Sequence, residues 1–246
     1  MREIPATALI IDIRDFTPTY RALDDAGRVE QFFGFLEAFL EINRAACVES
    51  FDGDPGDRLY LASTGDGVLA VFEGAPGEPP GRHAVRAWLA ALRLVERLPA
   101  LFAPFGDKQG SRFGIGIESG TVNRIGPGKL ATRIGHCINR AARLEPITKM
   151  FQGTMLVIGE QANQLLVQAI EGIDYAGLLA TTRVDKERAW AALREANDAL
   201  GVLWIGNLML KGVERPLHVF RASPLQLSTN LATMIAQGAI AVRATS

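Results

Sequence analysis

The sequence predicts an α/β or α+β protein built on one main sheet, and three observations support this fold class. The hydrophobic fraction of 48% and the charged fraction of 22% over 246 residues are typical of a globular protein with a sizeable core. Short apolar runs that suit strands alternate with segments whose apolar residues recur at helical spacing. No internal repeat or low-complexity segment interrupts this alternation, which disfavours a helical bundle or a sandwich.

Composition excludes several classes of protein. The net charge of −1 gives no overall basic field that would attract nucleic acid or an anionic membrane. Cys47 and Cys137 fall inside expected helices, and their spacing fits neither a zinc site nor a disulfide framework. The chain shows no positive-then-apolar leader and no apolar run of about 18 residues. We therefore expect a cytoplasmic protein that binds neither nucleic acid nor a membrane.

The first expected element is a buried central strand at Ala6–Ile13, whose residues are apolar apart from Thr7 and Asp12. Thr17 is placed to cap a helix whose first residue is Pro18, a position that suits proline. The other elements expected in the first half are a helix over 29–48, a hairpin with strands at 59–61 and 68–72, and a helix over 82–102.

The second half opens with an expected strand at Phe113–Glu118, where Gly114 and Gly116 put small residues on one face. Such a face is typical of a place where another backbone or a ligand comes close. Further strands are expected at 130–134, 154–158, 203–210 and 217–220, with a turn region at 120–128 and helices over 135–150 and 159–170. We assign 1–222 to one domain, with an added charged helix at about 181–200, and 223–246 to a helix-prone tail.

Two aspartates stand at the ends of expected strands. Asp66 lies at the tip of the hairpin between two glycines, where ordinary turn chemistry alone would explain it. Asp12 ends the first strand, so both carboxylates meet at one edge if that strand pairs with the hairpin. Two carboxylates on rigid strands suit Mg²⁺ or Mn²⁺ with substrate phosphates completing the shell. The helix that starts near Phe16 and Thr17 offers free N–H groups to those phosphates.

Two further features carry polar side chains. Asn139 and Arg143 are four residues apart on an expected helix, and therefore share one face. A solvated Asn and Arg at this spacing are also common. Lys211 ends an expected strand within Leu210-Lys211-Gly212, and an exposed lysine beside a glycine is equally ordinary. Neither feature specifies a function by itself.

Together these residues resemble the catalytic domain of the class III nucleotidyl cyclases, the adenylate and guanylate cyclase family. The resemblance spans roughly 7–222 and keeps the family's order of motifs. The five matching segments are Asp12-Ile13-Arg14-Asp15-Phe16-Thr17, Gly65-Asp66, Gly116-Ile117-Glu118-Ser119-Gly120, Gly135-His136-Cys137-Ile138-Asn139-Arg140-Ala141-Ala142-Arg143 and Leu210-Lys211-Gly212. The resemblance implies a ferredoxin-like βαββαβ core that is extended to the class III cyclase sheet, with helices packed on it.

The resemblance also implies roles for these residues. Asp12 and Asp66, with the Ile13 carbonyl, would bind two divalent metal ions, Mg²⁺ or Mn²⁺. Asn139 would orient the ribose of a nucleoside triphosphate, and Arg143 would stabilise charge on its α-phosphate. In the same way, Lys211 would hold the β- and γ-phosphates. Sites of this family form between two protomers, which implies a head-to-tail homodimer with two equal sites.

Asp15 departs from the family, which usually has glycine at its position. A carboxylate beside the phosphate loop could repel the triphosphate, but we expect it to point outward because its neighbours match the motif.

The base-reading positions depart further. Adenylate cyclases usually carry Lys, and guanylate cyclases Glu, where this chain has Ala62. The second base-reading position is Thr132, which can donate and accept a hydrogen bond. Strand alternation puts Tyr60 on the face of Ala62, where its ring could fill the space of a purine. Tyr60 is equally well explained as a half-buried strand residue.

Without the purine-reading pair, the chain resembles the pyrimidine cyclases of bacterial anti-phage signalling. Such enzymes make cyclic UMP or cyclic CMP, which activates a cyclic-nucleotide-responsive effector without direct contact. We expect UTP as the substrate, with an adenylate cyclase making cyclic AMP as the alternative. A non-catalytic cyclase-like partner is disfavoured because all five polar site residues are present. A sheet-based nucleic-acid binder is disfavoured by the near-zero net charge.

Overall fold

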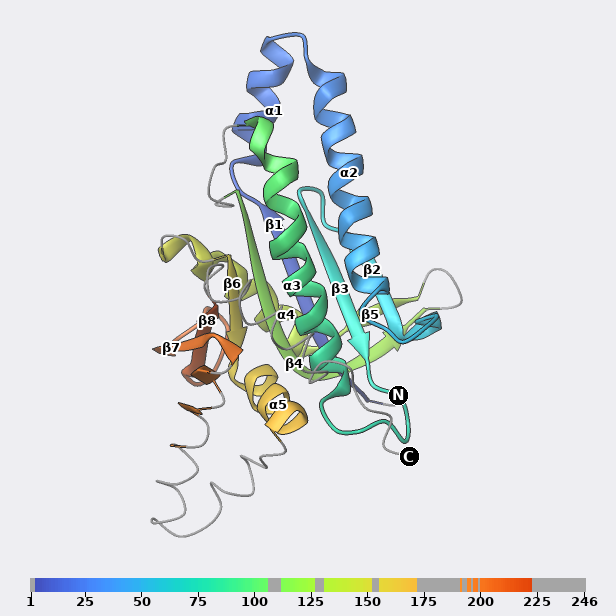
Figure 1. The fold of residues 1–246 in the computed structure, drawn as a ribbon, viewed down its shortest axis with the longest axis vertical. Coiled ribbons are helices and arrows are strands. Elements are labelled where there is room, and N and C mark those ends of the chain that lie inside the picture. The colour runs from blue at the N-terminus through green and yellow to red at the C-terminus, as the bar shows by residue number, and fades with distance from the viewer. Residues whose placement is uncertain are drawn as a thin grey trace.

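The computed structural model describes residues 3–105, 112–126, 131–151, 155–171, 191, 194, 195, 197, 198 and 200–222 (Figure 1). Within these ranges the chain forms an eight-stranded sheet in the order β2-β3-β1-β4-β6-β8-β7, and β5 pairs with β4 outside this path. The strands are β1 (Ile4–Ile13), β2 (Leu59–Ser63), β3 (Gly67–Glu73), β4 (Phe113–Ile125), β5 (Thr132–Ile134), β6 (Leu156–Gly159), β7 (Val202–Leu208) and β8 (Leu217–Ala222). The helices are α1 (Phe16–Asp25), α2 (Val29–Val48), α3 (Arg82–Phe102), α4 (His136–Leu144) and α5 (Glu160–Glu171).

The first half of the chain builds a βαββαβ unit. Its strands lie in the order β2-β3-β1-β4, and each neighbouring pair is antiparallel. This is the strand order of a ferredoxin-like core. The sheet then continues through the parallel pair β4–β6 and the antiparallel strands β8 and β7. The predicted fold class, a ferredoxin-like core extended to a larger mixed sheet, is confirmed.

The two faces of the sheet bury different clusters. Leu9 and Ile11 of β1 belong to the main core, which α2 and α3 cover (Figure 1). Ala6 and Ala8 alternate with them and pack instead with Cys137 of α4 on the opposite face. Because successive side chains on a strand point to opposite faces, Asp12 belongs to the α4 face. The described helices include none that is both long and apolar enough to cross a membrane.

Helix α4 lies directly against the backbone of β4. A Cβ atom at Gly116 would overlap the carbonyl oxygen of Ala141 and would lie 2.5 Å from the backbone nitrogen of Glu145. A Cβ atom at Gly120 would lie 3.2 Å from the Cβ atom of Cys137. The strand therefore needs glycine on this face, as the sequence predicted, because another backbone approaches it closely.

The start of α1 differs from the prediction. The helix begins at Phe16 rather than Pro18, and its N-cap is Asp15 rather than Thr17. Asp15 has φ 56° and ψ 31°, the left-handed conformation that glycine adopts without strain, and it is the one described residue other than glycine with positive φ. The side chain of Asp15 is exposed, which agrees with the outward orientation that we expected.

The predicted turn region at 120–128 is corrected by the structure. Strand β4 continues to Ile125 and pairs with β5, so Arg124 lies directly opposite Arg133. The added helix expected at about 181–200 falls mostly outside the described residues, of which 191, 194, 195, 197, 198 and 200 are helical. The tail at 223–246 lies outside them entirely.

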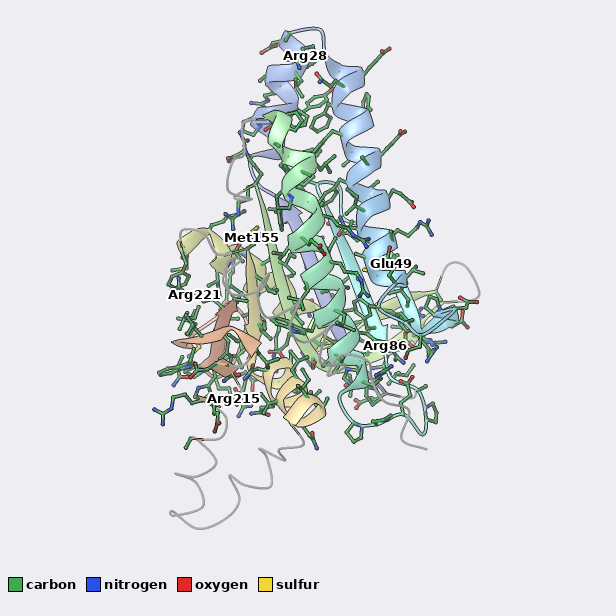
Figure 2. The ribbon with its side chains drawn as sticks, viewed as in Figure 1. Arg28, Glu49, Arg86, Met155, Arg215 and Arg221 are labelled. Carbon is green, nitrogen blue, oxygen red and sulfur yellow. The ribbon has the colours of Figure 1, made fainter. Side chains whose placement is uncertain are left out.

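The loop between β3 and α3 is fixed by two arginines. Glu78 accepts hydrogen bonds from Nη1 of Arg58 at 2.8 Å and from Nη1 of Arg86 at 3.0 Å. Arg86 lies in the first turns of α3 and is labelled in Figure 2. Although burial raises the pKa of Glu78, the bonds from Arg86 and from the Ala75 N–H lower it to about 2. This loop therefore holds the end of β3 in place.

The close approach of α4 to β4 generates a stability prediction. We expect Gly116→Ala to lower the free energy of unfolding by about 1–3 kcal/mol, because its Cβ meets backbone atoms that cannot move independently. Gly34→Ala on the exposed side of α2 is the control: its Cβ meets nothing within 4 Å, so it should raise stability by up to about 1 kcal/mol. Urea unfolding measures both. Equal stability of the two variants would contradict the packing argument.

Candidate active site

The pairing of β1 with β3 brings Asp12 and Asp66 together. Asp12 lies opposite Gly67, the residue that follows Asp66, and the Ile13 N–H donates to the Asp66 carbonyl oxygen at 3.0 Å. Burial and the neighbouring Asp66 carboxylate together raise the pKa of Asp12 to about 6, although Lys149 opposes the shift. The two carboxylates thus form a like-charge pair at one edge of the sheet, as the sequence predicted.

A third carboxylate adjoins this pair. Glu145 is 4% exposed, and its Oε1 has no hydrogen-bond partner among the described residues. It lies over Gly114, which is directly opposite Asp12 in the β1–β4 register. Burial raises the pKa of Glu145 to about 7; Lys149 opposes the shift, whereas Asp12 and Asp66 add to it. Its signal in the sequence is an acidic residue immediately after α4, and Glu145 was not among the predicted site residues.

The donor set fits a divalent cation that is shared with a substrate. Asp12 and Asp66 would supply oxygen ligands, and a cation between them would relieve the proximity of their charges. The described residues contain no group of three or more His, Cys, Asp or Glu side chains arranged to hold a metal alone. Mg²⁺ is commonly bound by one or two carboxylates together with water and substrate phosphates, which is the arrangement this site would require.

The turn after Asp12 leads directly into α1. The ring of Phe16 packs edge-on against Phe32 of α2, with ring centroids 5.1 Å apart, and so fixes the first turn of the helix. Thr17 is exposed at the second helical position. The first N–H groups of a helix have no partner within it and suit an anion. The residues predicted to cradle phosphate are therefore adjacent to the aspartate pair.

The residues predicted to read the base share a sheet face with Asp12. Tyr60 lies opposite Val71, and Ala62 lies opposite Leu69, in the β2–β3 register. Val71 in turn lies opposite Ala8 of β1. Ala8 precedes Asp12 by four residues, so these two residues are about 13 Å apart along the strand. The Tyr60 hydroxyl is 3.4 Å from Oγ1 of Thr132 on β5. The sheet face therefore runs from the carboxylate pair, past Ala62, to a Tyr60–Thr132 pair.

Asn139, Arg143 and Lys211 are positioned differently. Asn139 and Arg143 are exposed on α4, on the side opposite the buried Cys137 and Ala141. Lys211 is exposed in the turn after β7, close to the end of α4, because the preceding leucine packs with Leu144 and Ile147. In the part of the chain that the structure describes, no hydrogen bond or ion pair joins these three residues to Asp12 or Asp66. Within one described chain, these three residues are therefore not bonded to the aspartate pair.

The solved structures that this chain resembles include nucleotidyl cyclases. The adenylyl cyclase CyaB from P. aeruginosa aligns with a TM-score of 0.58 and 17% identity, over 89% of this chain and 94% of that one. The guanylate cyclase domain of RhGC from Catenaria anguillulae, solved with GTP, gives 0.58 and 18%, over 91% and 99%. The guanylyl cyclase Cya2 gives 0.55 and 21%, over 89% and 92%.

These comparisons establish that the chain has the fold of class III adenylyl and guanylyl cyclase catalytic domains. No family model matches the sequence, and neither does any curated protein.

Proposed function

We propose that this protein is a nucleotidyl cyclase that converts a nucleoside triphosphate to a 3′,5′-cyclic nucleotide and pyrophosphate. The observation that carries the proposal is the Asp12–Asp66 pair at the sheet edge, on a fold that is shared with cyclase catalytic domains. The first turn of α1 lies beside that pair, and the proposed base site lies at the other end of the same sheet face.

Different residues of the chain have different roles in this reaction. Asp12 and Asp66, with the Ile13 carbonyl, would hold two divalent ions, which when bound acidify the ribose 3′-hydroxyl and neutralise the phosphates. The N–H groups at Phe16 and Thr17 bind the triphosphate. Asn139 orients the ribose so that its 3′-oxygen faces the α-phosphorus. Arg143 stabilises the charge that grows on the α-phosphate, an interaction strongest in the transition state. Lys211 holds the leaving pyrophosphate.

The proposed enzyme is a head-to-tail homodimer. Asn139, Arg143 and Lys211 are exposed on one chain without contact to its own aspartates, which supports their delivery to the aspartates of a second copy. A two-fold arrangement of this kind creates two equivalent sites, each built from both chains.

We further propose a pyrimidine substrate, UTP before CTP, and a signalling role in anti-phage defence. Ala62 offers no side-chain partner to a purine, and the half-buried Tyr60 occupies the same face. Thr132 can serve uracil or cytosine. The order of UTP and CTP and the biological role rest on the resemblance to pyrimidine cyclases. The structural neighbours are adenylyl and guanylyl cyclases by name, so purine use is the competing outcome.

The metal assignment predicts opposite effects on activity and stability. We expect Asp12→Asn to lower turnover by about a hundredfold or more, because the 3′-oxygen is no longer activated. The variant should also unfold at a higher temperature without metal, because the like-charge pair is gone. Asp25→Asn, at an exposed residue of α1, is the matched control.

Pyrophosphate release and thermal unfolding with and without Mn²⁺ test this prediction. The control should gain stability from Mn²⁺ as the wild type does, whereas Asp12→Asn should gain less. A wild-type rate, or an undiminished gain from Mn²⁺, in Asp12→Asn would contradict the assignment.

The dimer predicts complementation between inactive variants. Asp66→Ala and Arg143→Ala should each be inactive alone. After subunit exchange in an equal mixture, half of the dimers contain one intact site, so activity should return to roughly a quarter of wild type. Mass spectrometry of differently tagged chains verifies the exchange. Exchange without activity would refute the shared site.

The base assignment predicts that UTP is the preferred substrate in a mixture of all four triphosphates at equal concentration with Mn²⁺. Loss of one buried hydrogen bond to a purine costs about 1–3 kcal/mol, or roughly ten- to hundredfold in selectivity. Mass spectrometry identifies the cyclic products. Cyclic AMP or cyclic GMP as the main product would refute the pyrimidine assignment alone, whereas no cyclic product would refute the cyclase.

A further inference from the structure

We propose that Arg133 is a positioning residue that sets base selectivity through Tyr60, and that the buried carboxylate of Glu73 anchors it. The inference rests on the proposed function, because it assigns residues to the base end of that site. It adds to the base site two residues that do not themselves contact the nucleotide.

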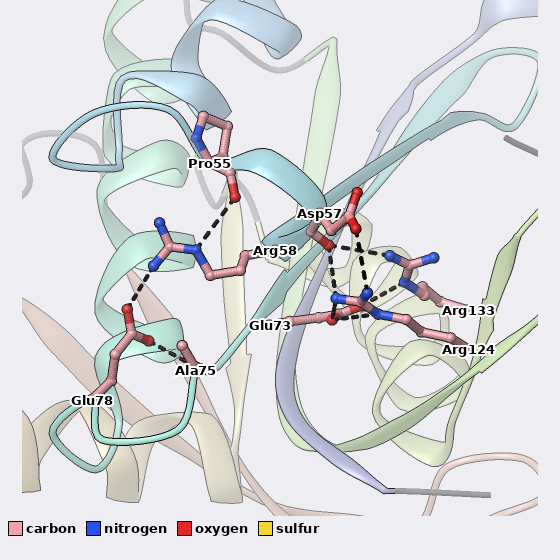
Figure 3. Close-up of polar contacts among 8 residues, drawn as sticks. All are labelled: Pro55, Asp57, Arg58, Glu73, Ala75, Glu78, Arg124 and Arg133. Atoms are coloured by element: carbon pink, nitrogen blue, oxygen red, sulfur yellow. Dashed lines mark hydrogen bonds and ion pairs between the residues drawn. The ribbon is translucent and has the colours of Figure 1, made fainter. Parts of the chain in front are cut away.

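Glu73 is the fixed point of this arrangement. It ends β3 on the same sheet face as Tyr60, since it lies two residues beyond Val71, and it is 1% exposed. A carboxylate so deeply buried requires charged partners. It accepts hydrogen bonds from Nε of Arg124 at 2.9 Å and from Nε of Arg133, which come from opposite positions of β4 and β5 (Figure 3).

The guanidinium of Arg133 is held at two points. Its Nε bonds Glu73, and its Nη2 donates to the backbone carbonyl of Asp57 at 3.2 Å (Figure 3). Its side chain is 7% exposed, whereas that of Arg124 is 37% exposed although it binds the same two groups. A planar group fixed in this way has little freedom to leave its position.

The fixed guanidinium covers one face of the Tyr60 ring. Its Cζ atom lies 5.1 Å from the ring centroid, within the range of a cation–π contact. The other end of the ring reaches Thr132, the neighbour of Arg133 on β5. Arg133 and Thr132 thus restrain Tyr60 on its face and at its hydroxyl, and the ring is preorganised before a nucleotide arrives.

Preorganisation of Tyr60 has a consequence for selectivity. While the ring is held, the depth of the base site and the direction of the Tyr60–Thr132 hydroxyl pair are constant. When Arg133 is removed, the ring can rotate about its side-chain torsions, and bases of different size can be accommodated. Discrimination among the four bases should fall, with the reacting end about 13 Å away unaffected.

Three single variants test this arrangement. Arg133→Met removes both the charge and the planar stacking, and should reduce the ratio of kcat/KM between the best and the worst triphosphate by about five- to tenfold. Arg133→Lys keeps a charge for Glu73 but has no planar group, so it should restore thermal stability without restoring selectivity. Arg124→Met is the matched control, because Arg124 shares Glu73 and Asp57, whereas the cation–π contact with the Tyr60 ring is made by Arg133.

The Tyr60→Ala background provides the decisive comparison. If Arg133 acts through the ring, Arg133→Met should change the kcat/KM ratio in the wild type but not in Tyr60→Ala. An equal effect in both backgrounds would overturn the inference, as would a loss of selectivity in Arg124→Met equal to that in Arg133→Met.

The same comparison can be made without turnover. Calorimetric titration with the four 3′-deoxynucleoside triphosphates, which cannot cyclise, measures base selectivity as a ratio of Kd values. If the wild type makes no cyclic nucleotide, the proposed function fails. In that case the Kd ratios still test the positioning role of Arg133. That role is contradicted if Arg133→Met leaves the ratios unchanged.

Discussion

The register of β1 between β3 and β4 is the constraint on which the site depends. It puts Asp12 beside the hairpin that carries Asp66. It also places Ala62 and Tyr60, through their partners on β3, on the same sheet face as Asp12. It also sets Gly114 and Gly116 of β4 beneath α4. A slip of one residue would place the Asp12 side chain on the opposite face of the sheet, in the core under α2 and α3. Such a slip is costly because β1 buries Leu9, Ile11 and Ile13 on that side.

Buried carboxylates occur in this protein for different reasons. Glu118 is fully buried and burial raises its pKa to about 7, yet its Oε1 accepts hydrogen bonds from the N–H groups of Ser119 and Ala162. It thereby stabilises the N-terminal turn of α5. Glu145 has a similar pKa, and each of the two glutamates leaves one buried oxygen unpaired, but only Glu145 faces the two aspartates Asp12 and Asp66. Burial and a raised pKa therefore do not identify a site, whereas the chemistry of the neighbouring groups does.

Sequence patterns predicted the parts of this fold that are locally determined. The helical spacing of apolar residues predicted α3 with its bounds. The small residues on one face of β4 indicated the close approach of α4. The end of β4 was missed because its pairing with β5 follows from tertiary contacts. The pairing of Asp12 with Asp66 was predictable because both lie at strand ends. Glu145 and Arg133 were not, since their importance arises from residues that are distant in the sequence.

The two ends of the sheet face have different structural support. The carboxylate end depends on β1, the hairpin turn and α1, whereas the base end depends on β2, β5 and the anchor at Glu73. About 13 Å separates them along the strands. Under the proposed function, substitutions at the base end would therefore alter which nucleotide fits while leaving the arrangement of the aspartates intact. A fold shared at 17–21% identity with adenylyl and guanylyl cyclases does not by itself decide the base. Base choice has to be argued from Tyr60, Ala62, Thr132 and the residues that hold them.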